Sequence, residues 1–214
     1  MKRYAIRALI LLALVGAWAV YRSATAPTYA HTGQAEMIPS DEPAQTDPEG
    51  APPVTLAFPD GQFTLSPQAA YRVTAKVASR RRYTTPWGGY VAPYDLVLFW
   101  GPLATSDTRW LHVEQDMRWY HFSFGGGAPF GVGFVGAHSA NTHVIPATPN
   151  LRRAIARLEE GGLAEFTGYL VFGTGTYQAG PIAWNSSLTR DDAGAGSCEL
   201  FYVTSIRVGD RLYR

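Results

Sequence analysis

Cysteine is nearly absent from this chain: Cys198 is the only one among 214 residues, which excludes an intramolecular disulfide. Carboxylates are absent from the first 22 residues, which hold four of the 18 cations. The remainder therefore carries a net charge of −3. That balance provides no overall electrostatic attraction for nucleic acid, so we expect no nucleic-acid partner.

The N-terminal segment has the pattern of a membrane-targeting signal. Three cations precede an apolar run from Ala8 to Tyr21. Cations before an apolar stretch keep the N-terminus in the cytoplasm while the following chain crosses the membrane. As a helix, residues 4–21 would span about 27 Å, close to the thickness of a hydrocarbon core. We therefore expect a retained single-pass anchor within residues 1–22.

The same segment leaves an alternative open. The small-residue triplet Ala17-Trp18-Ala19 suits the cleavage site of a signal peptide, with the mature chain beginning at Val20. Cleavage would release the rest of the chain on the far side of the membrane instead of tethering it there.

Composition divides the rest of the chain in two. Residues 23–53 are rich in Pro, Ala, Thr, Asp, Glu and Gly and have few large apolar side chains, which is typical of a flexible stalk. Residues 54–214 are expected to form one folded domain.

Strand patterns dominate that domain. Residues 71–77 alternate strictly between apolar and polar, as expected for a strand with one wet face. Further strands are predicted at 95–100, 110–113, 118–124, 164–172 and 199–208, where the lone Gly168 indicates a bulge or a tight bend. One helix is predicted to begin at Thr148-Pro149 and to end at Gly161-Gly162.

This order of elements predicts a mainly β fold with one short helix. A helix between an earlier group of strands and two long final strands is the order of an OB-type barrel. We therefore expect a small OB-like β-barrel, with another small barrel or a sandwich as the alternative.

A glycine-rich run, residues 131–136, matches the dinucleotide-binding pattern G-x-G-x-x-G. A functional fingerprint follows a strand and opens a helix in a βαβ unit, and this context is missing. The run is interpreted as a mobile apolar loop carrying Phe130 and Phe134, and no cofactor is predicted.

The segment from His138 to His143 is interpreted as an irregular loop rich in functional side chains. Its binding candidates are Ser139, Asn141 and His143. Two histidines five residues apart do not share a helix face, so no metal site is predicted. The simpler interpretation is that Asn141 and His143 hydrogen-bond the loop backbone.

A second polar cluster, residues 184–199, contains the binding candidates Ser187 and Arg190, followed by Asp191 and Cys198. A Cys–His–Asp arrangement of Cys198, His143 and Asp191 is chemically conceivable, with the imidazole activating the thiol. No cysteine-hydrolase signature surrounds Cys198, and the simpler interpretation is a hairpin-like connection with a buried, inert thiol.

Three consecutive cations, Arg80, Arg81 and Arg82, form a basic patch near Tyr83 and Trp87. On an OB-type barrel such a patch indicates binding of an anionic glycan or a protein. Three arginines at the end of a strand also suit a solvated turn.

Seven short stretches carry a resemblance: residues 38–45, 92–96, 100–102, 139–143, 145–147, 186–190 and 198–199. In them the chain resembles uncharacterised bacterial proteins that have an inner-membrane anchor, a Pro-rich stalk and a single periplasmic β-rich domain. The resemblance implies a periplasmic C-terminal domain and brings no activity.

Two functional hypotheses follow. The first is a non-enzymatic, membrane-tethered periplasmic domain that binds another envelope component, either a protein or a glycan. The second is a cell-wall hydrolase or transferase that uses Cys198 and His143.

Overall fold

Strands dominate the fold, as the sequence predicts. The computed structural model describes residues 2–33, 36–84, 86–189 and 197–214. Strands account for 47% of the chain and helices for 19%. The mainly β prediction is therefore confirmed, although the described residues contain four short helices after the N-terminal one, instead of one.

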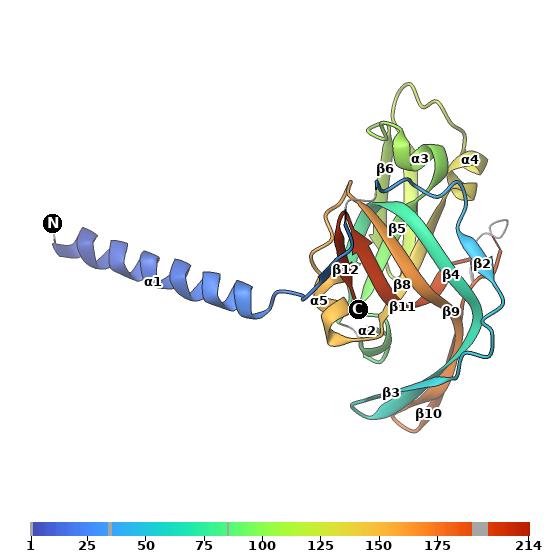
Figure 1. Ribbon diagram of the computed structural model, residues 1–214, viewed down its shortest axis with the longest axis horizontal. Coiled ribbons are helices and arrows are strands. Elements are labelled where there is room, and N and C mark those ends of the chain that lie inside the picture. Colours follow the sequence, from blue (N-terminus) through green and yellow to red (C-terminus); the bar gives the residue numbers. More distant parts are fainter. Residues whose placement is uncertain (1, 34–35, 85, 190–196) are drawn as a thin grey trace.

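The long helix α1 (Lys2–Ala24) projects from the strand-rich part of the molecule, and the others are short (Figure 1). The short helices are α2 (Gly88–Val91), α3 (Gly101–Thr105), α4 (Val132–Ala137) and α5 (Pro149–Ile155). Within the described residues, no helix combines the length and the apolarity that a membrane crossing requires.

Five strands pair in a closed circuit. They are β4 (Gly61–Arg82), β5 (Tyr94–Phe99), β8 (Ser139–Pro146), β11 (Glu199–Val208) and β9 (Leu163–Tyr177). Each pairs with the next in that order, and β9 pairs back with β4. The β8–β11 pairing is parallel, whereas the other four are antiparallel.

The remaining strands extend this circuit or stand apart from it. β3 (Val54–Phe58) and β10 (Gly180–Asn185) pair with the ends of β4 and β9, and the four strands form a curved arm (Figure 1). β6 (Leu111–Asp116) and β7 (Trp119–Phe124) form a separate hairpin. β1 (Ala30–His31) pairs with β12 (Arg211–Tyr213), and β2 (Ala44–Thr46) pairs with β4.

Alternate residues of the five strands build the main core. Val73, Leu96, Val144, Phe166 and Phe201 have no exposed surface and belong to one apolar cluster. Because side chains of a strand alternate between its two faces, the residues between them lie on the outer face. The outer faces of β5 and β8 therefore carry three polar side chains, those of Asp95, Asn141 and His143.

The helix predicted after residue 147 is present but shorter than expected. The Thr148 hydroxyl accepts a hydrogen bond from the Leu151 N–H at 3.1 Å, and Pro149 occupies the first turn, as predicted. Regular helix ends at Ile155, and two turns continue to Gly161.

Two segments predicted as loops are regular. Residues 132–137 form α4, and residues 139–146 form β8, so Ser139, Asn141 and His143 are strand residues. The loop interpretation is wrong because β8 pairs on both sides and nearly all of its side chains are buried, which leaves no alternation in its sequence.

Parts of the predicted stalk lie against the domain. Residues 30–31 pair with β12, residues 44–46 pair with β4, and the Ser40 N–H donates to the Thr74 carbonyl at 2.9 Å. The boundary at residue 53 stays a prediction, but this segment makes more contacts than its composition indicates. Gly168 lies opposite a register shift in β11, between Val203 and Ser205, in agreement with the predicted irregularity.

Candidate functional site

The outer faces of β5 and β8 hold a buried polar cluster. Asp95 on β5 lies directly across from His143 on β8, and Asn141 is two residues away on the same face. Asp95 has no exposed surface, Asn141 is 1% exposed and His143 is 3% exposed. Burying so many polar groups is costly unless they are paired, so their partners define the site.

The β6–β7 hairpin supplies the central cation. Met117 and Arg118 form its two-residue turn, and both have positive φ (45° and 72°). Turns of this kind normally carry Asn or Gly, because other residues are strained there. The turn directs Arg118 toward Asp95 on β5, and the contacts that Arg118 makes there offset the strain.

Arg118 joins the hairpin to the sheet. Its Nη1 donates to Asp95 Oδ1 at 2.6 Å and to the Ala92 carbonyl at 2.9 Å. The guanidinium carbon lies 3.9 Å from the ring centroid of Tyr83 and 5.4 Å from that of Trp184. The cation is therefore held by one carboxylate and two aromatic faces.

His143 also faces Asp95. Its Nδ1 is 2.9 Å from Asp95 Oδ1, but the contact lacks the angle of a hydrogen bond, so it attracts only when the imidazole is protonated. The ring of His143 also lies 4.6 Å from that of Trp184. Among the described residues, no protein group hydrogen-bonds Asp95 Oδ2 or Arg118 Nη2, although both atoms are buried.

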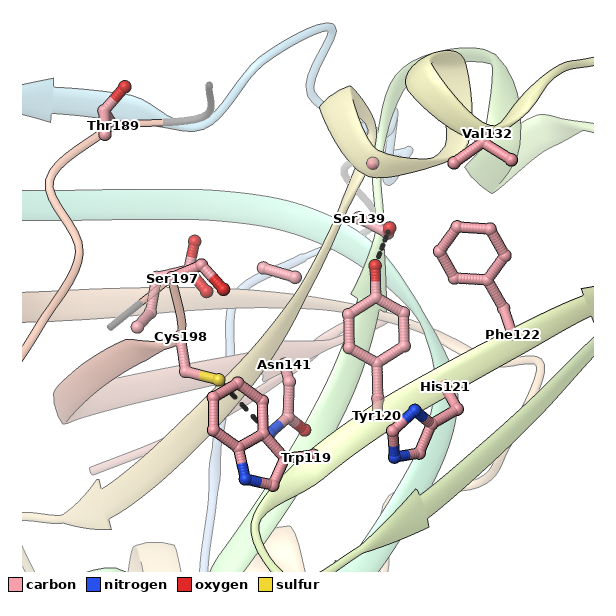
Figure 2. Close-up of a pocket in the computed structure, with 13 residues that line it drawn as sticks. Trp119, Tyr120, His121, Phe122, Val132, Ser139, Asn141, Thr189, Ser197 and Cys198 are labelled. Carbon is pink, nitrogen blue, oxygen red and sulfur yellow. Dashed lines mark hydrogen bonds between the residues drawn. The ribbon is translucent and has the colours of Figure 1, made fainter. Parts of the chain in front are cut away.

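Asn141 connects this cluster to Cys198. Its Oδ1 accepts from Gln115 Nε2 at 2.9 Å, and its Nδ2 donates to the Arg118 carbonyl at 2.8 Å. The same Nδ2 lies 3.7 Å from Cys198 Sγ, a weak hydrogen bond that Figure 2 shows beside Trp119. Cys198 is partly buried, contrary to the interpretation as a core residue, and its reactivity stays a prediction.

Two cavities meet at Cys198 and Trp119. One, of about 550 Å³, is lined by three tryptophans together with Arg118, His143 and Cys198; the tryptophans are Trp87, Trp119 and Trp184. We call it the tryptophan cleft. The second, of about 480 Å³, is lined by Tyr120, Ser139, Asn141 and Cys198 among others (Figure 2).

Tyr120 is the hydrogen-bonding phenol of the second cavity. Burial raises the pKa of the phenol, partly opposed by its hydrogen bond to Ser139, while the nearby Glu199 and Cys198 raise it further. The two hydroxyl oxygens are 2.7 Å apart, and Ser139 Oγ also donates to the Val135 carbonyl at 2.5 Å. Tyr120 therefore stays a neutral hydrogen-bonding group at neutral pH.

Four of the predicted residues converge: Ser139, Asn141, His143 and Cys198 line one or both cavities. Ser187 lies next to them, because its N–H donates to the Cys198 carbonyl at 3.0 Å, and its hydroxyl forms a local turn with Thr189. The predicted residues Arg190 and Asp191 lie outside the described residues.

The three arginines of the predicted basic patch have different surroundings. All three lie within β4 and pair in register with β5, so they are not a solvated turn. Arg81 donates to the Gln115 carbonyl and to Asp116 Oδ1, which anchors the hairpin. The backbone N–H of Arg80 donates to Glu160 Oε1 at 3.0 Å, whereas Arg82 is exposed.

The main residues that sequence reasoning missed are Asp95, Arg118 and Trp119, whereas Trp87 and Trp184 lie in or next to predicted clusters. One signal was available: Asp95 opens an otherwise apolar strand that is covered on both sides, and a carboxylate there needs a cationic partner. Nothing in the sequence identifies Arg118 as that partner. No group of three metal-binding side chains is present in the described part of the chain.

Comparisons with family models, with curated proteins and with solved structures found no match to this chain. The resemblance to uncharacterised periplasmic proteins therefore stays a prediction, and function must be argued from the site alone.

Proposed function

We propose that this domain is an OB-like barrel that binds a glycan of the cell envelope in the tryptophan cleft, without catalysis. The barrel is supported by the closed five-strand circuit, its parallel β8–β11 pair and the position of α5 between β8 and β9. In OB-folds, ligands bind on the face of the second and third strands, between the loops that follow the first and fourth.

The tryptophan cleft occupies the corresponding place. Of its lining residues, His143 comes from the third strand of the circuit, where it lies across from the buried Asp95 of the second. Trp87 comes from the loop after the first strand, and Trp184 from the strand that follows the fourth. The single observation that carries the proposal is this concentration of three indole rings around buried polar groups. Flat apolar walls with a few polar groups at the floor suit the faces and hydroxyls of sugar rings.

The test is calorimetric titration of the full chain in detergent with soluble peptidoglycan fragments. Trp119→Ala should weaken binding about tenfold, since a central aromatic contact contributes on the order of 1–2 kcal/mol. Phe124→Ala is the matched control: both side chains lie on β7 and are 38% exposed, but Phe124 packs on Trp110, outside the cleft.

Equal loss of affinity in the two variants, or no binding by the unaltered chain, would contradict glycan binding in the cleft. If envelope extracts instead yield a protein partner whose capture depends on Trp119, the cleft is a protein-docking site and the glycan proposal is wrong.

We also propose that α1 tethers the domain to the bacterial inner membrane on its periplasmic side. α1 does not combine the length and apolarity expected of a membrane crossing, so the tether is a proposal and not a finding. It rests on the exposed apolar side chains of a 23-residue helix, which include Leu11, Leu14 and Trp18. Retention of the full chain in membranes after alkaline carbonate washing tests it; a soluble chain that begins at Val20 would overturn it.

A second candidate function is thiol-dependent acyl transfer at Cys198. It is favoured by a carboxylate beside His143: Asp95 Oδ1 lies 2.9 Å from Nδ1, without hydrogen-bond geometry, so Asp95 in place of Asp191 would be the acidic member. In such a reaction His143 would accept the Sγ proton, the thiolate would attack a carbonyl carbon, and the imidazolium would protonate the departing amine. Water would then hydrolyse the thioester and restore the thiol.

The reactivity of the thiol separates the two functions. A catalytic thiolate reacts with iodoacetamide near neutral pH much faster than free glutathione does, and His143→Gln should abolish the difference. Labelling of Cys198 no faster than glutathione would exclude this mechanism and leave glycan binding unaffected.

A further inference from the structure

The chain that leaves α1 is fixed to one end of the domain. The Asn150 side chain binds the backbone of Thr28 in both directions: Oδ1 accepts from the N–H and Nδ2 donates to the carbonyl, each at 2.8 Å. Arg157 Nη2 donates to the carbonyl of Arg22, in the last turn of α1, at 2.9 Å. The helix and the domain are therefore joined by a short, bonded connection.

This connection decides which end of the domain lies near the base of α1. The four residues that follow Ala24, up to Thr28, reach at most about 14 Å. Figure 1 shows α5, β12 and the C-terminal end on the side from which α1 leaves. If α1 is anchored as proposed above, this end of the domain faces the lipid headgroups.

The same end is rich in arginine. α5 and its following turn carry Arg152, Arg153 and Arg157, and β12 begins with Arg211; all four are exposed. Glu159 and Glu160 are the acidic residues on this turn, and Glu160 accepts a hydrogen bond from the Arg80 N–H at 3.0 Å. Beside β12, the Asp210 carboxylate contacts His31 Nδ1 at 2.9 Å. The balance of charge facing the base of α1 is positive.

The surface is also hollowed. A cavity of about 450 Å³ lies between the linker after α1 and the domain, and its lining includes Pro27, Tyr29, Leu158, Arg157 and Arg211. The guanidinium of Arg211 lies 5.1 Å from the Tyr29 ring. Apolar walls with guanidinium groups suit a phosphate headgroup and the first carbons of its acyl chains.

We infer that the α5–β12 end of the domain docks on anionic phospholipid headgroups of the membrane that holds α1. The inference rests on the proposed tether. Charge complementarity and continuity with α1 select the lipid surface as the occupant, because arginines within a Debye length of an anionic surface are attracted to it.

The test uses the full chain in nanodiscs of phosphatidylcholine, with or without phosphatidylglycerol, followed by hydrogen–deuterium exchange. In anionic discs, exchange in residues 149–158 should be about tenfold slower than in neutral discs. About 1 M salt should remove the difference, since it shortens the Debye length to about 3 Å.

Charge reversal identifies the surface. The double variant Arg152→Glu/Arg153→Glu should abolish the lipid dependence of exchange. The control, Arg72→Glu/Arg109→Glu, changes the net charge equally at exposed sites on β4 and before β6, and it should preserve that dependence. Circular dichroism melting of the variants verifies that they are folded.

Equal exchange in neutral and anionic discs would overturn the docking surface while leaving the tether and the cleft intact. Protection by soluble glycerol phosphate in neutral discs would replace the lipid surface with a free-phosphate site. A chain that does not enter discs at all overturns the tether and, with it, this inference.

Discussion

Removing the cation of Arg118 should destabilise the protein far more than removing a comparable cation elsewhere. The chain contains a natural comparison, because two Arg–Asp pairs have the same N–O distance of 2.6 Å. The Arg118 and Asp95 side chains are 19% and 0% exposed, whereas those of Arg109 and Asp107 are 91% and 57% exposed. Burial is the main difference between the pairs.

The expected magnitude follows from what each substitution leaves behind. Arg118→Met leaves Asp95 charged and fully buried, which costs about 3–5 kcal/mol. Methionine keeps much of the apolar volume of arginine and is strained equally at positive φ, so the loss of stability measures the effect of removing the guanidinium charge. Hydrogen bonds from Arg109 lower the pKa of Asp107 to about 2, but solvent screens that exposed pair and Arg109→Met should have no measurable effect.

Urea denaturation followed by tryptophan fluorescence measures both variants. With a slope of about 2 kcal/mol/M, Arg118→Met should lower the midpoint by about 2 M. Adding Asp95→Asn to Arg118→Met should recover more than half of the loss, because the buried charge is then gone. Equal midpoints for the Arg118 and Arg109 variants, or no recovery in the double variant, would refute the reasoning.

Three other substitutions test separate contacts. Asn150→Ala removes two hydrogen bonds to the backbone of Thr28, so amide exchange in the linker after α1 should accelerate about tenfold by mass spectrometry. Burial raises the pKa of Tyr120, so the stability that the neutral phenol contributes is complete below pH 10 and is lost as pH rises through the folded-state pKa. Urea titrations between about pH 9 and 11 measure this loss of stability, and Tyr120→Phe should make it smaller. Gly168→Ala would place a Cβ on the carbonyl oxygen of Tyr202, so thermal melting should show a loss of about 3 kcal/mol in the free energy of unfolding. An unchanged melting temperature would mean that β9 and β11 separate easily.

Strands are predicted best from the sequence where one face of the strand is exposed to solvent. Residues 71–77 alternate because one side of β4 packs inward while Arg72 is exposed, and this strand was predicted correctly. β8 has no such signal: the side chains from Ser139 to Ile145 are all buried, since α4, the hairpin and the core cover both faces. Its polar residues gave it the composition of a loop.

The site was predicted only in part for a related reason. Asn141, His143 and Cys198 were selected because reactive side chains gather near them in sequence. Asp95 and Arg118 meet across 23 positions through a turn whose sequence, Met-Arg, lacks the usual turn residues. Such a contact depends on how the hairpin folds over the sheet, which local pattern does not encode.

The course of β11 connects the two proposed sites. Cys198, which lines the tryptophan cleft, directly precedes β11, and Val208 at the end of β11 lines the cavity beside the linker after α1. At about 3.3 Å per residue, the ten residues of β11 separate the two sites by roughly 30 Å. If the domain docks on lipid by its α5–β12 end as proposed, the cleft faces away from the membrane, toward the proposed glycan ligands. Because the sites are so far apart, Trp119→Ala should leave the lipid dependence of exchange unchanged, and the Arg152/Arg153 reversal should leave glycan affinity unchanged.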